Sequence, residues 1–359
     1  MPRAALALPL ALGRRQPRRA KRLARAPQLQ YPKDAEKFYA VFLQGQVRRL
    51  HDFTMARLVP AYREFAAEHT PATAPASPET GSGRQDARCT LRPPGSRQGT
   101  AQEARADADA RSLLRLLHGV RIEWERVSEA SGQLDLPLAQ VGKSISDVGK
   151  QGLTEQVHSV LGINPLFRDT RLASRLARFR RENVQLIKSI SDKYFAQVGA
   201  VVQRGVDAGT RPEVMADLFE ERYGVTRSRA NLIARDQTAK LHSDLNQMRQ
   251  EDLGVRSYTW RTSLDERVRP DAGAIKRGAD PDDEATSHRA REGRIYRWDE
   301  PPGDPADPAA GGHPGRAINC RCWSEPNLAE LLDSLESGEP VEEGATEPSE
   351  GEAEQEQER

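Results

Sequence analysis

Two cysteines and two histidines near the C-terminal end of the chain are the residue types best suited to binding a metal ion. Cys320 and Cys322 form a C-x-C pair, and His288 and His313 precede this pair in the sequence. Thiolate sulfur and imidazole nitrogen are preferred ligands of zinc, and a Cys2His2 set is a normal structural zinc shell. The residue types therefore predict a structural zinc site made by His288, His313, Cys320 and Cys322.

The C-x-C pair lies in the segment 318–323 (INCRCW), whose composition predicts a strand. Side chains alternate along a strand, so both thiols would point to the same face, with their Cα atoms roughly 6.5–7 Å apart. This separation is at the long edge for a disulfide, but it suits two thiolates that bind one metal. In the alternative interpretation, Cys320 and Cys322 are half-buried strand residues and His313 only begins a His-Pro-Gly turn.

A second set of candidate residues combines acids with guanidinium groups: Asp265, Glu266, Arg267 and Arg269. They could contact a partner or a DNA backbone, or form an ion-paired loop at the end of a strand. With His313 and Asn319, the two acids could also surround a catalytic metal, as in a metal-dependent nuclease. A catalytic zinc keeps one position open, whereas two cysteines and two histidines would close the shell. The nuclease is therefore the weaker alternative.

The elements around these residues are short. Strands are predicted at 255–262 (VRSYTWRT), 294–298 (RIYRW) and 318–323, with loops rich in Gly, Pro and Asp between them. Residues 255–326 are therefore predicted to form a small, loop-rich β module. Trp260 and Trp298 are expected in the core of this module, and Pro314 is expected to stiffen a loop.

Several short motifs follow one another through this module. They are W-x-T-x-x-D-E-R-V-R from Trp260, H-x-x-x-x-G-x-x-x-x-W-D-x-P-P from His288, and H-P-G-x-x-x-N-C-R-C from His313. The helix before them carries IARDQTAKLH at 233–242, and RENVQLIKSI lies at 181–190. This order resembles the Mu F-like family of phage minor head proteins over roughly residues 165–326. Besides the acids, guanidiniums and metal-ligand candidates, the motif residues are Trp260, Gly293, Trp298, Asp299, Pro314, Gly315 and Asn319.

The resemblance implies a structural protein of the phage or prophage head and not an enzyme. Such a protein would act in head morphogenesis, contact the portal and other procapsid proteins, and lie close to packaged DNA. It would be found in the host cytoplasm during assembly and afterwards in the virion head, with no membrane and no small-molecule substrate. A toxin or effector domain fused to a head module is a further alternative, but the remaining sequence leaves no room for one.

One segment departs from the family pattern. In the family, the histidine follows the V-R-P segment directly, whereas here the segment 271–286 lies between Pro270 and Ser287. This segment is rich in Asp, Gly and Ala, so we interpret it as a surface insertion. It raises the question of whether His288 occupies the place of the family histidine.

The rest of the ordered chain is predicted to be helical, at 34–68 and over 109–254. In the first segment, apolar residues near helical spacing are Phe38, Val41, Phe42, Val47, Leu50 and Phe53. In the second, a stripe with steps of three or four predicts one long amphipathic helix. Its residues are Leu172, Leu176, Phe179, Asn183, Ile187, Ile190, Tyr194, Val198 and Val201. Asn183, and Gln237 on a later stripe, are expected to be hydrogen bonded, because an unpaired buried amide is costly.

Glycines predict where the later helices end. Gly209 fits a stop, and Thr210 with Pro212 fits the start of a new helix. Gly224 fits the end of that short helix, with Thr226 as the cap of the next one, which would stop at Gly254.

Composition divides the remaining chain. The chain has 359 residues with 30% charged and 37% hydrophobic residues and a net charge of +1. A basic arm (1–33), a low-complexity linker (69–108) that contains Cys89, and an acidic tail (327–359) are predicted to be disordered. The apolar stretch 4–13 is a poor signal peptide, because arginines follow at once and no small-x-small cleavage site is present. The prediction is an α+β protein: a mostly helical elongated bundle, then the small β module.

Overall fold

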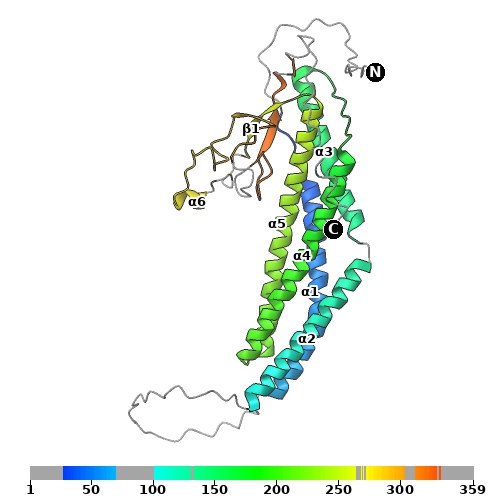
Figure 1. The fold of residues 1–359 in the computed structure, drawn as a ribbon, viewed down its shortest axis with the longest axis vertical. Helices are drawn as coiled ribbons and strands as arrows, with labels where there is room; N and C mark the ends of the chain where they lie inside the picture. Colours follow the sequence, from blue (N-terminus) through cyan, green and yellow to red (C-terminus); the bar gives the residue numbers. More distant parts are fainter. Residues whose placement is uncertain are drawn as a thin grey trace, which may run out of the picture. The chain divides into compact units, whose positions relative to one another are not determined.

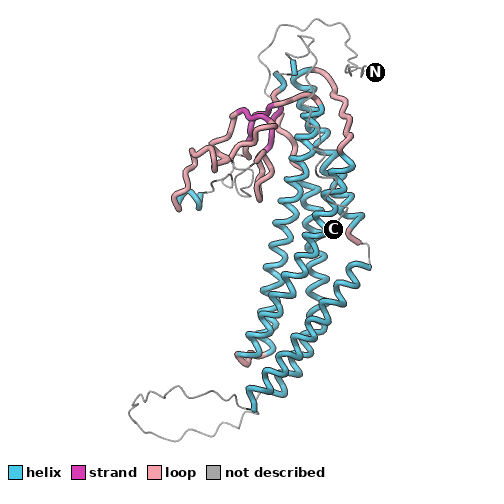
Figure 2. Tube along the Cα trace, in the orientation of Figure 1, coloured by secondary structure: helices cyan, strands magenta, loops and turns pink. Residues whose placement is uncertain are grey.

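The computed structural model describes residues 27–69, 101–130, 133–263, 268, 270, 272–303, 312–329 and 331–332. Within these residues the protein is mostly helical and has one small antiparallel sheet, so the predicted α+β class is confirmed (Figures 1 and 2). The elements are α1 (Lys33–His69), α2 (Ala101–Ala130), α3 (Asp135–Leu161), α4 (Leu172–Asp207), α5 (Pro212–Asp252), β1 (Ser257–Arg261), α6 (Ala272–Lys276), β2 (Ile295–Arg297) and β3 (Trp323–Pro326). None of the described helices has a stretch long and apolar enough to cross a membrane.

The chain divides into two compact units. The helical unit contains the described residues within 32–145 and 173–241, and the C-terminal unit contains those within 27–31, 146–172 and 242–332. Both α3 and α5 contribute residues to each unit. The end of α5 belongs with the sheet, since Asn246 Nδ2 donates a hydrogen bond to Ser324 Oγ at 2.9 Å. The predicted helical segment 109–254 is therefore divided between the two units, whereas residues 255–326 lie within the C-terminal unit.

The helical unit has one large apolar core. Its fifteen buried members come from four helices: Leu50, Leu58, Tyr62, Leu113, Leu117, Val120, Trp124, Tyr194, Phe195, Val198, Val201, Val202, Val206, Met215 and Phe219. The stripe predicted on α4 is buried from Phe179 onward. Asn183 lies on this buried stripe and is hydrogen bonded as predicted: it accepts from Tyr39 Oη at 2.5 Å and donates to Gln237 Oε1 at 3.3 Å.

Two expectations about α1 and α2 need correction. On α1 the buried face contains Tyr39, Leu43 and Leu50, whereas Phe38 and Val41 are 46% and 60% exposed. The six apolar residues chosen from the sequence did not define the face, because Tyr39 and Leu43, which were not among them, are buried. Helix α2 begins at Ala101, within the predicted linker, in a run of strong helix formers. Cys89 and the rest of the linker up to residue 100 lie outside the described residues.

The predicted break at Gly224 is wrong. Helix α5 runs without interruption from Pro212 to Asp252. Thr226 does not cap a new helix, since its hydroxyl donates to the carbonyl of Arg222 at 2.8 Å, one turn back. A glycine inside a helix costs only about 1 kcal/mol, and buried Phe219 and Ala230 on either side keep both halves packed. The predicted ends near Gly209 and Gly254 are confirmed, because α4 ends at Asp207 and α5 at Asp252.

The C-terminal unit contains a three-stranded antiparallel sheet with the order β2-β1-β3. The register pairs Tyr258 of β1 with Tyr296 of β2 and with Pro326 of β3. The first two strands lie where they were predicted. The third begins only at Trp323, because the segment before it is a turn: Cys320 N donates to Ala317 O at 3.0 Å. The strand predicted at 318–323 is therefore wrong.

Two apolar clusters support this unit. One joins the end of α3, the end of α5 and the chain after β3, and includes buried Leu153, Val255, Leu328 and Leu331. Leu29 is also buried, against Gly152. Parts of the predicted disordered arm and tail therefore pack against the protein, through Leu29 at one end and through Leu328 and Leu331 at the other. The second cluster lies on the sheet and contains Tyr258, Trp260, Trp298, Ala317, Cys320 and Cys322.

Candidate metal centre

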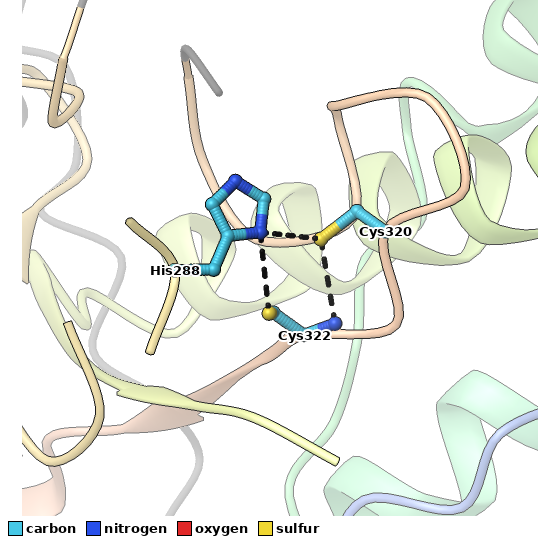
Figure 3. A group of neighbouring side chains, drawn as sticks. All are labelled: His288, Cys320 and Cys322. Carbon is cyan, nitrogen blue, oxygen red and sulfur yellow. Dashed lines mark hydrogen bonds between the residues drawn. The ribbon is translucent and has the colours of Figure 1, made fainter. Parts of the chain in front are cut away.

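Three of the four predicted zinc ligands lie together. One ligand atom each from His288, Cys320 and Cys322 falls within 4.8 Å of the others. Figure 3 shows one ring nitrogen of His288 facing both thiols; this Nδ1 is 3.4 Å from Cys320 Sγ and 3.6 Å from Cys322 Sγ. All three side chains are buried, with exposed fractions of 2%, 6% and 8% for His288, Cys320 and Cys322.

A tight turn, not a strand, brings the two cysteines to one side. Asn319 adopts a positive φ of 64°, which reverses the chain just before Cys320. The backbone N–H groups of Gly315 and Cys322 both point at Cys320 Sγ, each at 3.4 Å. Two backbone donors on one sulfur stabilise its thiolate form, which is the form that binds metals.

His288 reaches the site from the end of the insertion. Ser287 fixes the chain there: its N–H donates to Asp283 O at 2.7 Å and its hydroxyl donates to Pro281 O at 2.7 Å. The His288 ring contacts Trp260 edge to face, with 5.2 Å between the ring centroids. The insertion therefore does not carry His288 away from the cysteines, and its last residues anchor the loop that holds the histidine.

A buried arginine next to the cluster was not expected from the sequence. Arg291 is completely buried, donates hydrogen bonds to Glu284 O (2.8 Å) and Ala285 O (2.6 Å), and lies 5.0 Å above the Trp260 ring. Burial lowers the pKa of Arg291, although the neighbouring Tyr296, Tyr258 and Cys322 act against this. The only sequence signal was the spacing His288-x-x-Arg291, which places both residues on the same turn.

The two thiols influence each other strongly. A hydrogen bond from Cys322 lowers the pKa of Cys320 well below its usual value, and His288 adds to this effect. Burial, together with the neighbouring Cys320, raises the pKa of Cys322 well above its usual value. Of the two thiols, Cys320 is therefore the one that loses its proton more readily.

His313, the fourth predicted ligand, lies elsewhere in the sheet cluster. Its Nδ1 is 2.9 Å from the hydroxyl of Tyr258, and its ring lies 5.0 Å from Trp298. Burial lowers the pKa of His313 to about 4, and Arg316 acts in the same direction. The structure thus gives His313 a structural contact with aromatic side chains and does not place it with the cysteines.

The other motif residues hold the module together or lie outside the described part. Trp260 and Trp298 are buried in the module core, as predicted. Gly293 has a φ of +78° and donates its N–H to Trp260 O at 2.8 Å, and Asp299 pairs with Arg297 at 2.9 Å. Pro314 accepts a hydrogen bond from Ser243 through its carbonyl. Asp265, Glu266, Arg267 and Arg269 lie outside the described residues.

A carboxylate that the sequence did not single out connects β1 to the loop before β2. Glu292 accepts hydrogen bonds from the N–H of Thr262 at 2.6 Å and from its hydroxyl at 2.8 Å. It also forms an ion pair with Arg261 at 3.3 Å. Glu292 follows Arg291 directly, so the hydrogen bonds of two neighbouring side chains hold the loop between His288 and β2 in place.

Comparison with known proteins agrees with the motifs. Residues 196–324 match the family described as phage Mu protein F like protein. A relative from Haemophilus influenzae, described as an uncharacterized protein, is 36% identical over 146 residues, which are 41% of this chain and 28% of the relative. No solved structure matches the chain. The resemblance is therefore confirmed for residues 196–324, a Mu F-like segment that includes α5, the sheet and all three clustered ligands.

Proposed function

We propose that this chain is a minor head protein of a tailed phage or prophage that acts in head morphogenesis and binds the portal protein. The observation that carries the proposal is the Mu F-like match over residues 196–324. The chain spans 28% of the length of its Haemophilus influenzae relative. The proposed role therefore rests on the shared segment. It places the protein in the host cytoplasm during assembly and then in the virion head.

The structure suggests which surface of the helical unit would contact the portal. The apolar stripe of α4 is buried inside this unit, so it is not available to a partner. On α5, by contrast, Val214, Val225 and Leu232 are exposed. Their spacings of 11 and 7 residues bring them back to within about 20° of the same direction on a helix. They mark one exposed face of the helix over about 27 Å, which a partner helix could cover.

Co-expression with the portal protein of the same phage or prophage tests this surface. Val225→Glu combined with Leu232→Glu should reduce capture of the portal by about tenfold or more, because two charges would be buried in the interface. The matched control is Val127→Glu on α2, since Val127 is 50% exposed and Val225 is 45% exposed. Exposed substitutions change stability little, so both proteins should fold.

Each outcome has a distinct meaning. Capture that survives the α5 double substitution would show that the contact lies elsewhere. Equal losses in the α5 variant and in the Val127→Glu control would point to a general effect of negative charge. Mass spectrometry of purified procapsids and virions tests the head assignment itself, and absence of the chain from both particles would contradict it.

The same proposal includes a contact with packaged DNA through the basic arm. Residues 1–30 carry eight Arg or Lys and no acid. Binding by such an arm should weaken steeply with salt, because each neutralised phosphate releases counterions. Removal of residues 1–26 should abolish salt-dependent DNA binding, and unchanged binding would show that the arm has no such role.

The alternative of a metal-dependent nuclease finds less support. Its predicted constellation required His313 and Asn319 around one metal. In the structure His313 contacts Tyr258, and Asn319 is an exposed turn residue. The three clustered ligands are buried, which leaves little room for a nucleic-acid phosphate. A Mg²⁺- or Zn²⁺-dependent DNA cleavage that disappears in His313→Gln would nevertheless reverse this order of preference.

A further inference from the structure

We infer that His288, Cys320 and Cys322 bind one zinc ion, which fixes the loop of His288 to the turn that carries the two cysteines. This inference does not depend on the proposed role in the phage head. It differs from the expectation based on the sequence, since His313 is not one of the ligands.

The distances fit zinc coordination. Zinc binds cysteine sulfur at about 2.3 Å and histidine nitrogen at about 2.0–2.1 Å with tetrahedral geometry, which places nitrogen and sulfur about 3.6 Å apart. The observed separations between His288 Nδ1 and the sulfurs of Cys320 and Cys322 are 3.4 and 3.6 Å. Small adjustments of the side chains would therefore suffice to bind the ion.

Hydrogen bonding alone does not explain why both sulfurs face the same ring nitrogen. In neutral histidine, Nδ1 carries either one proton or one lone pair, so it makes one strong hydrogen bond and not two. One metal ion accepts a lone pair from each of the three atoms at once. The other ring nitrogen, Nε2, is buried without a hydrogen-bond partner among the described residues. Nδ1 is therefore the atom through which this histidine can make its polar interaction.

The surroundings also suit a cation that is bound by thiolates. Two backbone N–H groups point at Cys320 Sγ, and the buried guanidinium of Arg291 lies over the ring of Trp260, which also contacts His288. The two N–H groups stabilise negative charge on the Cys320 sulfur, which would be costly in a buried position without a cation. Two thiolates and an imidazole select a soft or borderline ion such as zinc over magnesium or calcium.

The ion would contribute mainly to stability. Its ligands come from positions 288 and 320–322, so binding closes a loop of more than thirty residues in a module whose apolar cluster has only six buried members. Small modules commonly need such a staple. No other described His, Cys, Asp or Glu joins the group, so the fourth position would hold water or another small ligand.

Metal analysis of the full-length protein tests the inference. The chain purified without chelator should contain about one zinc, bound by two sulfurs at about 2.3 Å and one nitrogen at about 2.0–2.1 Å in X-ray absorption spectra. Removal of the ion with a strong chelator should lower the melting temperature, and added zinc should restore it, because binding energy is here folding energy.

Substitutions distinguish the proposed ligands from their neighbours. Cys320→Ser, Cys322→Ser and His288→Ala should each lose the bound zinc, whereas His288→Cys should keep it, because a third thiolate replaces the imidazole. His313→Gln and Cys89→Ser are matched controls that should keep about one zinc per chain. If the ligand variants fail to fold, titration of metal-free wild-type protein with Co²⁺ gives the same information through its thiolate charge-transfer absorption.

Three results would overturn the inference. The first is a wild-type chain that contains no zinc and takes up neither Zn²⁺ nor Co²⁺. The second is zinc that persists in His288→Ala but is lost in His313→Gln. The third is a Cys320–Cys322 disulfide in protein that has been kept under reducing conditions, which alkylation and mass spectrometry would detect.

Discussion

The core of the helical unit and the sheet cluster of the C-terminal unit stabilise their units in different ways. The first buries fifteen side chains in one cluster, nearly all aliphatic or aromatic, from four long helices. The second buries six, and two of these are the cysteines of the candidate metal centre. The first core depends little on any single side chain, because many residues contribute to it. The second depends on a few side chains, including a buried arginine and a histidine, whose exact partners matter.

The largest effect that this comparison predicts follows from the removal of one aromatic side chain in each core. Truncation of a buried Trp or Phe to Ala usually costs about 3–5 kcal/mol. Trp260 and Phe219 are both almost fully buried. We expect Trp260→Ala to unfold the β module and Phe219→Ala only to lower the melting temperature, because Phe219 has many more neighbours in its cluster.

Circular dichroism separates these outcomes. In Trp260→Ala the near-ultraviolet signal of the aromatic cluster should be lost at a temperature at which the far-ultraviolet helical signal persists. In Phe219→Ala both signals should be kept at room temperature. Parallel loss of both signals in Trp260→Ala would show that the helices and the module unfold as one cooperative unit.

The same contrast explains what the sequence could predict. The stripe on α4 repeats every three or four residues over nearly thirty positions, so its buried face was predictable from Phe179 to Val201. The hydrogen-bonded Asn183 followed from the cost of burying an amide. Helix ends were predictable where a glycine met a change of pattern, as at Gly254, but not at Gly224, where packing on both sides outweighs the local preference.

The metal centre was predictable in its residue types but not in its geometry. Cys320 and Cys322 were expected to share a face because side chains alternate on a strand, whereas a turn at Asn319 with positive φ brings them together. The spacing in the sequence could not show which of His288 and His313 lies with the two cysteines. The choice between them depends on Ser287, which holds the end of the insertion, and on contacts between residues far apart in the chain.

Buried histidines allow a second test of the comparison, with an expected effect of intermediate size. His242 of the C-terminal unit is fully buried beside Arg249, and burial lowers its pKa to about 4. His51 of the helical unit also has a lowered pKa because of burial, but Glu220 acts in the opposite direction. The C-terminal unit should therefore be the more sensitive to acid.

The sign follows from proton linkage. His242 stays neutral in the folded protein but binds a proton below its ordinary pKa of 6.5 in the unfolded chain. Its contribution to stability is present above pH 6.5 and is lost as the pH falls toward about 4. A shift of this size corresponds to about 3 kcal/mol.

Denaturant titrations between pH 7 and pH 4 measure this dependence. The free energy of unfolding should fall less steeply in His242→Gln than in the wild type. His118→Gln, which replaces an exposed histidine on α2, should not change the slope. Identical slopes for wild type and His242→Gln would show that His242 does not stay neutral in the folded protein.

The smallest predicted effect tests the continuity of α5, which the sequence pattern at Gly224 contradicts. A Cβ atom at Gly224 would meet no heavy atom within 4 Å, and the position lies inside the helix at the solvent-exposed surface. Gly224→Ala should therefore raise the free energy of unfolding by about 0.5–1 kcal/mol, because alanine loses less backbone entropy in a helix. Gly254→Ala should do the opposite, since its φ of +83° strains any residue with a Cβ atom. Equilibrium denaturation of the two variants measures both signs.

If Gly224→Ala destabilises the protein instead, the helix breaks at Gly224, and Val214 then no longer lies on the same helix face as Val225 and Leu232. The proposed portal surface would in that case shrink to the part of α5 that follows the break.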